Sequence, residues 1–408
     1  MTGFGAIRTP RNIVFGKGQR GAMGKSAARL GSRAFVCTDE RLGADRPFAA
    51  MMDDLKTNGV EVQVFDRAVA ELPLSCIDDS RAAAGKFGPD VVIGIGGGSC
   101  MDLAKATAVM LTHGGNIRDY YGEFKVPGPV LPLISVPTTA GTGSEVTPVA
   151  VLGDPERIMK VGIASPHIIS HTAICDPELT YTCPAGLTAI SGADALTHAI
   201  EAFSALRRPP TPQLVHEHVF VGKNLLSDHH ALLAIELISR SLARACGDGD
   251  DEAAREDMML GALAAGLAFG TAGTAAAHAI QYPVGALTHT PHGTGVALLM
   301  PYVMEFNRTA CIPEFARIAT AMGIDRAGLD DDALSIAAIS RVASLFGEIG
   351  LPRTLAELGV APAQLPWIAE QSLASQRLVK NNPIPLDIDR LGQIAKAAFD
   401  GILASPTS

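Results

Sequence analysis

The chain has 408 residues, a length that usually divides into two domains. Hydrophobic residues make up 47% of it and charged residues 18%, which are the proportions of a well-buried globular protein and exclude an intrinsically disordered chain. The formal net charge is −9, and no basic stretch with interleaved aromatic residues occurs, so we expect no nucleic-acid partner.

The sequence also has the features of a cytoplasmic protein. The first residues, MTGFGAIRTPRNIVFG, lack the apolar core of a signal peptide, and no apolar run reaches the ~18 residues that a membrane span needs. The seven cysteines are scattered and include no C-x-x-C pair, which is typical of reduced thiols and leaves no cysteine-based zinc site. We therefore expect a cytoplasmic protein without a membrane partner that acts on a small molecule.

Up to residue 183, short apolar runs alternate with helical stretches, a pattern that predicts parallel β/α units. The predicted strands are 33–39, 60–66, 90–98 and 130–139. Helices are predicted over 77–87 and 103–111.

Beyond residue 183 the strand pattern fades, and Ala- and Leu-rich helical segments follow. The predicted helices are 186–204, 229–246, 252–269, 333–348 and 389–404. The sequence thus predicts an α/β domain over 1–183 and an all-helical domain over 184–408, with the ligand cleft between them.

The segment 205–230 is predicted to be a Pro-rich loop, longer than most connections between helices. It contains four histidines: His216, His218, His229 and His230. These side chains could bind a metal ion, although histidines in a loop are more often solvated.

The stretch VVIGIGGGSCMDLAKA (91–106) combines a buried strand, a glycine turn and the start of a helix. Gly96, Gly97 and Gly98 would let the backbone approach a phosphate, to which the helix N-terminus offers N–H groups. We expect Ser99 to cap this helix, with Asp102 completing a capping box. The pattern is neither G-x-G-x-x-G nor a Walker loop, so a phosphate site and a plain tight turn both stay open.

A second turn, SVPTTAGTGSEVT (135–147), follows the last predicted strand of this domain. It places four hydroxyl groups at the carboxyl end of that strand, those of Thr138, Thr139, Thr142 and Ser144. Nucleotides bind at this edge of open parallel sheets. Two such turns on one edge favour a dinucleotide over a lone phosphate.

In SGADALTHAIEAF (191–203), Asp194 and His198 stand four residues apart, on one face of a predicted helix. Taken alone, such a pair is more often hydrogen-bonded than bound to a metal. His278 and His292 lie further along the chain, and each alone is more often a hydrogen-bonded core residue. Together the carboxylate and three imidazoles could hold a divalent ion and leave room for an oxygen ligand.

Over nearly its whole length, the chain resembles the iron-containing, or group III, alcohol dehydrogenases. The motifs that carry the resemblance are GGGSCMDLAK, PTTAGTGSEVT, DPELT, SGADALTHAIEAF and HAIQYPVGALTHTPHG. The resemblance implies an α/β N-terminal dinucleotide-binding domain followed by an all-α C-terminal domain, an architecture shared with dehydroquinate synthase. It also implies metal-dependent transfer of hydride between a nicotinamide cofactor and a small alcohol, aldehyde or ketone.

The resemblance assigns roles to individual residues. It implies a catalytic divalent ion, iron or zinc, held by Asp194, His198, His278 and His292. It implies a pyrophosphate site made of Gly97, Gly98, Ser99 and Asp102, and a further cofactor lining of Thr138, Thr139, Thr142, Ser144 and Lys160. The residues that it places near the substrate are Val149, Val151, Phe269 and Thr274.

Two positions depart from the family pattern. Many members have a second histidine four residues after the one that matches His278, where this chain has Tyr282. Where members often have an asparagine, this chain has His289. We expect both side chains to act in proton transfer or substrate choice without holding the metal. The alternative for Tyr282 is that it packs beside Pro283.

Asp39 stands at the end of the predicted strand 33–39. An acid there can accept both hydroxyls of an adenosine ribose and repel a 2′-phosphate, which predicts NAD in preference to NADP. In the usual Rossmann order this acid follows the glycine loop, whereas here it precedes the loop, so the position depends on the family resemblance. Asp39 could instead, or in addition, cap a helix that begins at ERLGA.

Two other functions fit parts of the sequence. A lyase of the dehydroquinate synthase type would use NAD and metal internally, but it needs several Lys and Arg to hold an anionic substrate. The stretch AAGLAFGTAGTAAAH beside the predicted metal ligands is small and apolar. A nucleotide-binding regulator would have a closed, structural metal site. For the assembly, we expect a homodimer or a larger homo-oligomer.

Overall fold

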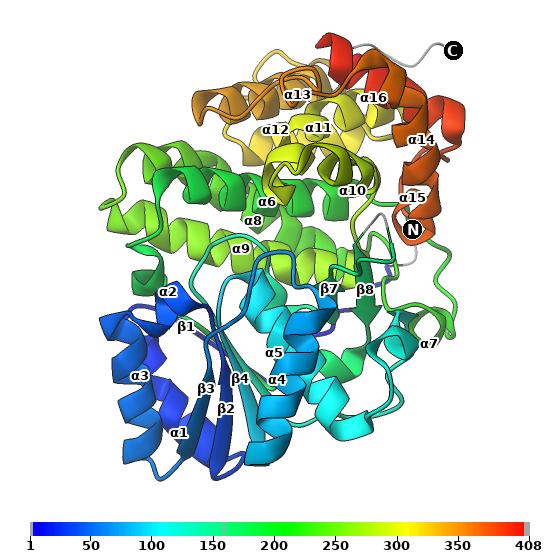
Figure 1. Cartoon of the computed structure of the whole chain (residues 1–408). Coiled ribbons are helices and arrows are strands. Elements are labelled where there is room, and N and C mark those ends of the chain that lie inside the picture. Colours follow the sequence, from blue (N-terminus) through cyan, green and yellow to red (C-terminus); the bar gives the residue numbers. More distant parts are fainter. Residues whose placement is uncertain (1–2, 158–159, 404–408) are drawn as a thin grey trace. The chain divides into compact units, whose positions relative to one another are not determined.

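The structure is a computed structural model that describes residues 3–157 and 160–403 (Figure 1). The described residues form two compact units. The α/β unit contains residues 8–157, 160–183 and 215–219, and the helical unit contains residues 3–7, 184–214 and 220–403. This division differs from the predicted boundary after residue 183 at two short segments, 3–7 and 215–219.

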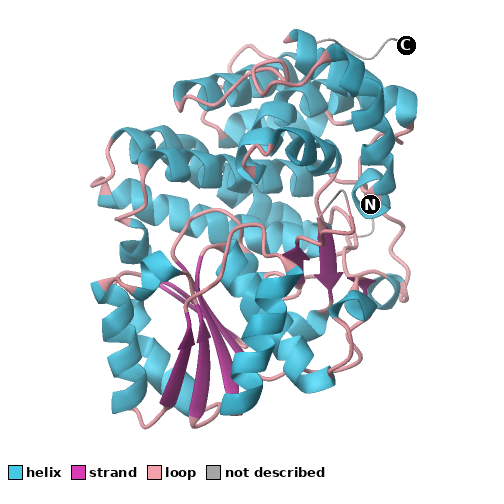
Figure 2. Cartoon of the chain, viewed as in Figure 1, coloured by secondary structure: helices cyan, strands magenta, loops and turns pink. Residues whose placement is uncertain are grey.

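The α/β unit is built on a parallel sheet of six strands in the order β1-β9-β6-β4-β2-β3 (Figure 2). These strands are β1 (Asn12–Phe15), β2 (Arg33–Cys37), β3 (Glu61–Phe65), β4 (Val91–Gly96), β6 (Leu133–Pro137) and β9 (Thr172–Cys175). The four predicted strands are present in shortened form as β2, β3, β4 and β6. The central strands β4 and β6 are fully buried and almost entirely apolar, as expected of a parallel sheet covered on both faces.

Helices cover both faces of this sheet (Figure 1). They are α1 (Met23–Ala28), α2 (Glu40–Gly43), α3 (Arg46–Thr57), α4 (Leu74–Phe87) and α5 (Gly98–His113). On one face, Phe48 and Leu55 of α3 belong to the same core cluster as Ile93 of β4. On the other face, Ile77 of α4 and Leu103 of α5 share a cluster with Phe35 of β2. The two predicted helices correspond to α4 and α5.

A second, small sheet of three strands has the order β5-β8-β7, and its strands are β5 (Gly122–Glu123), β7 (Val149–Leu152) and β8 (Val161–Ala164). No part of this sheet was predicted, because strands of two to four residues are too short to show a period. The 3-10 helices are η1 (Gln19–Ala22), η2 (Ile117–Tyr120), η3 (Ser144–Val146), η4 (Pro166–Ile168), η5 (Pro177–Thr180), η6 (Arg308–Ala310) and η7 (Pro362–Gln364).

The remaining helices are α6 (Ala185–Ser204), α7 (Leu214–Glu217), α8 (Leu225–Gly247), α9 (Glu252–Ala272), α10 (Ala276–Thr288), α11 (His292–Asn307), α12 (Ile312–Ala321), α13 (Asp331–Glu348), α14 (Leu365–Ala374), α15 (Gln376–Val379) and α16 (Ile388–Asp400). The five predicted helices correspond to α6, α8, α9, α13 and α16; residue 404, the last of the predicted set, lies outside the described residues. Helix α6 packs against α8, α9 and α11, and nearly all of it beyond its first turn is buried.

The predicted loop over 205–230 is wrong in two parts: α7 (Leu214–Glu217) includes His216, and α8 begins at Leu225 and includes His229 and His230. Asn224 is the N-cap of this helix, and its side-chain oxygen accepts hydrogen bonds from the backbone N–H groups of Leu226 and Ser227. An asparagine at this position satisfies N–H groups that have no partner inside the helix.

Helices α9 and α10 meet at a bend of 101°. Among the described residues, no single helix is both long and apolar enough to cross a membrane, and α9 and α10 meet that description only as this bent pair.

A buried ammonium group holds the turn that follows β6. Lys105 of α5 has a fully buried side chain, and its Nζ donates to the carbonyl oxygens of Ser144 (2.6 Å), Thr147 (3.1 Å) and Val149 (2.8 Å). Burial lowers the pKa of Lys105 to about 8, although the carboxylates of Asp102 and Glu145 act in the opposite direction. Lys105 thus ties the turn and β7 to α5.

Glu145 lies in the same turn and is only 2% exposed. Desolvation raises the pKa of Glu145 to about 7, because its own backbone N–H and the Lys105 ammonium compensate only part of the cost of burying a carboxylate. The folded protein therefore keeps the Glu145 proton at pH values where the unfolded chain, with an ordinary pKa of 4.5, has lost it.

This difference predicts a pH dependence of stability. The stability that protonated Glu145 contributes is complete below pH 4.5 and is lost as the pH rises to about 7. We expect the free energy of unfolding to fall by roughly 2–3 kcal/mol more between pH 4.5 and 8 in the wild type than in Glu145→Gln. Urea unfolding at several pH values measures this. Glu370→Gln, a substitution of an exposed glutamate, is the control. If the free energy of unfolding of the wild type and of Glu145→Gln changes with pH in parallel, the assignment is contradicted.

Candidate functional site

Three helices of the helical unit bring the predicted metal ligands together. Asp194 and His198 lie one turn apart on α6, His278 lies in the first turn of α10, and His292 is the first residue of α11. The Oδ1 atom of Asp194 lies 3.6 Å from Nε2 of His198, 3.8 Å from Nε2 of His278 and 3.9 Å from Nε2 of His292. One carboxylate oxygen therefore faces three imidazole nitrogens.

These distances suit a metal ion in the middle. Metal–ligand bonds of about 2.0–2.2 Å in a tetrahedral site place ligand atoms about 3.4 Å apart. Ligand atoms of Asp194, His278 and His292 all lie within 4.8 Å of one another. Within the described part of the chain, no other group of three or more histidine, cysteine or acidic side chains meets this criterion, so His216, His218, His229 and His230 form none.

Two buried atoms of this group lack hydrogen bonds. Neither Oδ1 of Asp194 nor Nε2 of His278 has a hydrogen-bond partner among the described residues. Leaving a buried polar atom in this state costs about 1–3 kcal/mol, and more for a charged group. A divalent ion would give both atoms a partner, and three imidazoles with one carboxylate suit iron or zinc. The residues present fit the predicted ion.

Aromatic contacts fix the imidazole rings. The ring of His198 is stacked on Phe269, with centroids 4.1 Å apart, and on His278, with centroids 4.7 Å apart. The side chains of Asp194, His198 and His278 are at most 8% exposed, whereas that of His292 is 25% exposed. An exogenous molecule would therefore approach this group more easily from the side of His292.

A glycine allows α11 to approach α6. A Cβ atom on Gly293 would lie 2.4 Å from the carbonyl oxygen of Ile190, a distance that real Cβ atoms do not adopt. The absence of a side chain after His292 therefore lets the first turn of α11 lie against the helix that carries Asp194 and His198.

Glu201 belongs to this site and was not predicted. It lies on α6, seven residues after Asp194 and three after His198, and it is 1% exposed. Its Oε2 atom lies 2.6 Å from Nδ1 of His278. The spacing along α6 could have indicated Glu201, since residues three and seven positions apart lie on the same face of a helix.

The structure treats Tyr282 and His289 differently. The ring of Tyr282 is stacked on His292, with centroids 5.9 Å apart, and Tyr282 packs against the cluster of Ala279, Leu378 and Val379. Burial raises the pKa of Tyr282. His289 is the exposed C-terminal cap of α10 and has a positive φ of 54°. Within the described residues, the His289 side chain forms no hydrogen bond, ion pair or ring contact with the predicted ligands.

The glycine turn of the α/β unit differs from its prediction at the helix cap. Gly97, not Ser99, is the N-cap of α5, and no side chain of the described residues caps this helix, so the predicted capping box is wrong. The cause lies in the backbone of Gly96, whose φ of 144° turns the chain early and starts the helix at Gly98. Asp102 accepts instead from the Ser144 hydroxyl (2.6 Å) and the Val151 N–H (2.9 Å).

The two predicted turns lie side by side at the carboxyl ends of the paired strands β4 and β6. A Cβ atom on Gly98 would lie 2.8 Å from Cγ2 of Thr142. Gly97, Gly98 and Ser99 are partly exposed, and among the described residues no side chain caps the N–H groups at the start of α5. Thr138 is buried, and its hydroxyl has no hydrogen-bond partner among the described residues. The backbone N–H and hydroxyl groups at this edge are hydrogen-bond donors that suit a phosphate group.

Asp39 follows β2, which pairs with β4, at the same end of the sheet. Its Oδ1 atom accepts a hydrogen bond from the backbone N–H of Leu42 at 2.8 Å. Asp39 therefore caps α2, which is one of the two roles predicted for it. Its Oδ2 atom lies 3.8 Å from Sγ of Cys100. Lys160 forms an ion pair with Glu71, with Nζ and Oε2 2.6 Å apart.

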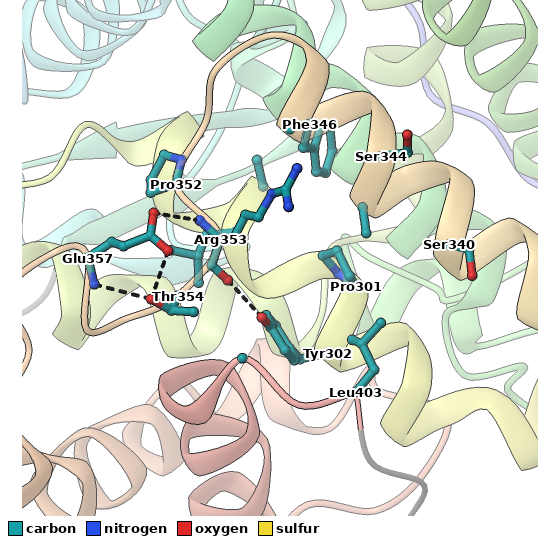
Figure 3. A pocket seen from close by; sticks show the side chains of 15 residues that line it. Pro301, Tyr302, Ser340, Ser344, Phe346, Pro352, Arg353, Thr354, Glu357 and Leu403 are labelled. Carbon is teal, nitrogen blue, oxygen red and sulfur yellow. Dashed lines mark hydrogen bonds between the residues drawn. The ribbon is translucent and has the colours of Figure 1, made fainter.

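A separate pocket of about 560 Å³ lies in the helical unit among α11, α13 and the residues around Arg353 (Figure 3). Its polar groups largely bond to one another: the Tyr302 hydroxyl donates to the carbonyl oxygen of Arg353, and the Thr354 hydroxyl donates to Glu357 (Figure 3). None of the predicted metal or cofactor residues lines this pocket.

Comparison with known proteins gives matches through both units. The family described as iron-containing alcohol dehydrogenase matches residues 10–177, and the C-terminal part of the Fe-containing alcohol dehydrogenase family matches residues 188–399. Long-chain-alcohol dehydrogenase 1 of Geobacillus thermodenitrificans is 37% identical over 384 residues, which cover 93% of this chain and 92% of that protein.

Solved structures agree with these matches. A 1,3-propanediol oxidoreductase superposes with a TM-score of 0.90 at 32% identity, over 97% of this chain and all of that one. The sulfoacetaldehyde reductase of Bifidobacterium kashiwanohense, solved in complex with NAD+, superposes with a TM-score of 0.82 at 28% identity, over 98% of this chain and 99% of that one. The predicted fold, an α/β domain followed by a helical domain, is confirmed. The chain belongs to the iron-containing alcohol dehydrogenase family and is an oxidoreductase of the alcohol dehydrogenase type.

Proposed function

We propose that this alcohol dehydrogenase depends on NAD and on a divalent metal, and that it transfers hydride between the nicotinamide and a small alcohol, aldehyde or ketone. The observation that carries the proposal is the arrangement of one buried carboxylate oxygen 3.6–3.9 Å from three imidazole nitrogens. Membership of the family supports it, as does a structural relative solved with NAD+.

Asp194, His198, His278 and His292 would hold the metal, iron or zinc. When bound, such an ion lowers the pKa of a coordinated hydroxyl and stabilises negative charge on its oxygen. The protein's own contribution is positional: Phe269 holds the His198 ring by stacking, and Gly293 lets His292 reach the group. The His292 side chain is 25% exposed, so a substrate oxygen could reach the ion from that side.

The turns of the α/β unit would hold the cofactor. The N–H groups of Gly97, Gly98 and Ser99 suit its pyrophosphate, and Gly96 lets the chain turn into α5. The rest of the proposed lining is Asp102, Thr138, Thr139, Thr142, Ser144 and Lys160. NAD+, when bound, accepts the hydride. We further propose a cytoplasmic homodimer or larger homo-oligomer.

One experiment separates this proposal from its two rivals. The same preparation is assayed for bound metal and for reduced nicotinamide formed from a series of small alcohols and diols. A lyase that recycles NAD internally would release no reduced cofactor, and a regulator with a structural metal would turn over no alcohol. We expect the metal to be present and reduced nicotinamide to accumulate.

Removing one ligand should abolish turnover. We expect His278→Ala to lose most of its bound metal and at least 100-fold in kcat/KM, because the three ligands left around an enlarged hole hold an ion weakly. Metal analysis and activity of the same sample are the measurements. His229→Ala, which removes a histidine outside the group, is the control. Near-normal metal content and activity in His278→Ala would disprove the ligand assignment.

Tyr282 is proposed to act on proton transfer or substrate choice, and its ring contact with His292 supports this role. We expect Tyr282→Phe to keep its metal and its stacking but to change the pH profile of kcat/KM or the ranking of alcohols, because only the hydroxyl is lost. An unchanged profile and ranking would indicate that Tyr282 only packs. His289→Asn tests the same role for His289.

Asp39 is proposed to select NAD over NADP. At about 4 Å in a partly solvated site, like charges cost roughly 4 kcal/mol at an effective dielectric constant of 20, and even a quarter of that gives several-fold discrimination. We expect Asp39→Gly to narrow the preference mainly by improving the use of NADP. The substitution also removes a helix cap, so Asp330→Gly, which removes the cap of α13, is the matched control. Equal efficiency with both cofactors in the wild type would rule out this role.

A further inference from the structure

Glu201 occupies the corner between α9 and α10, where it accepts three hydrogen bonds. Its carboxylate accepts hydrogen bonds from the backbone N–H groups of Ala275 (2.9 Å) and Ala277 (2.7 Å). Its Oε2 atom lies 2.6 Å from Nδ1 of His278. The first N–H groups of a helix have no partner inside the helix, and a negative charge there is stabilised by the helix dipole. The buried carboxylate thus meets the start of α10 at its backbone and at His278.

This contact determines which nitrogen of His278 carries the proton. An ionised carboxylate can only accept a hydrogen bond, so Nδ1 is the donor and Nε2 keeps its lone pair. Nε2 is the atom that lies 3.8 Å from Asp194 Oδ1 and has no hydrogen-bond partner among the described residues. The hydrogen bond therefore presents to the ligand group the nitrogen that a metal needs.

We propose that Glu201 is a positioning residue for the metal site, which fixes the ring orientation and the tautomer of His278. The inference rests on the proposed function, since it concerns the affinity of the same site. Helix α6 then supplies two ligands, Asp194 and His198, and also the support of a third. Removing a carboxylate partner of a ligating histidine typically costs 10–100-fold in metal affinity.

The chain offers a control for a purely structural role. Asn381 holds the same corner from another side, because its Nδ2 donates to the carbonyl oxygens of Ala272 (3.0 Å) and Thr274 (3.1 Å). It makes no recorded contact with His278 in the part of the chain that the structure describes. Asn381→Ala therefore loosens the corner without changing the partner of the imidazole.

The test measures cobalt binding, because Co²⁺ reports both affinity and coordination geometry. The full-length protein is stripped with a chelator, and its affinity for Co²⁺ is measured by competition with a chromophoric chelator, together with the visible absorption of the bound ion. We expect Glu201→Gln to bind Co²⁺ 10–100-fold more weakly with an altered spectrum. Asn381→Ala should stay within about threefold of the wild type with an unchanged spectrum.

Wild-type affinity and spectrum in Glu201→Gln would overturn the inference, as would equal losses in both variants, which would show a role at the corner alone. If Glu201→Gln does not fold, Glu201→Asp, which keeps the charge but is too short to reach Nδ1, is judged by the same criteria. Failure of the proposed function has a different signature: the wild type itself would bind no Co²⁺, or would bind it and oxidise no alcohol.

Discussion

The helical unit is organised around a buried negative charge. Asp194 stands in the middle of α6, the helix that packs against α8, α9 and α11, where its carboxylate is largely removed from water. Burying an unpaired carboxylate costs several kcal/mol, so its surroundings must provide positive charge. Three imidazoles from α6, α10 and α11 point their Nε2 atoms at it. A divalent ion held among these four groups, as proposed, would supply that positive charge.

Buried ionisable side chains also hold in place the segments that carry the two candidate sites. Glu201 accepts the first N–H groups of α10, and Lys105 donates to three carbonyl oxygens of the turn after β6 and of β7. In each case a buried side chain that projects from a helix makes several hydrogen bonds to the backbone of a neighbouring segment. The irregular backbone of both candidate sites is thereby fixed by the helices α6 and α5, which suits residues that must hold a defined geometry.

Much of this organisation was predictable because it depends on local periodicity. The strands β2, β3, β4 and β6 and the helices α6, α8, α9, α13 and α16 follow from periodic apolar residues, whereas α3 and α11 were not predicted. The spacing of Asp194 and His198 predicts their common face on α6. The sequence signals failed where backbone geometry or distant partners decide. The S-x-x-D pattern at Ser99 favours a capping box, but the positive φ of Gly96 starts the helix earlier and frees Asp102 for the second turn. The spacing of Glu201 from Asp194 and His198 indicates their common face on α6, but its role depends on His278, a partner 77 residues away that spacing along one helix cannot identify.

The central claim is that one divalent ion sits among Asp194, His198, His278 and His292 with a coordination position open to substrate. Anomalous diffraction from crystals of the purified protein, recorded on both sides of the iron and zinc absorption edges, tests it most directly. The account predicts a single strong peak within about 2.0–2.2 Å of the Asp194 carboxylate and the three imidazole nitrogens, with a solvent or substrate oxygen as a further ligand. A peak at the histidines of 216–230, or an ion enclosed entirely by protein ligands, would contradict it.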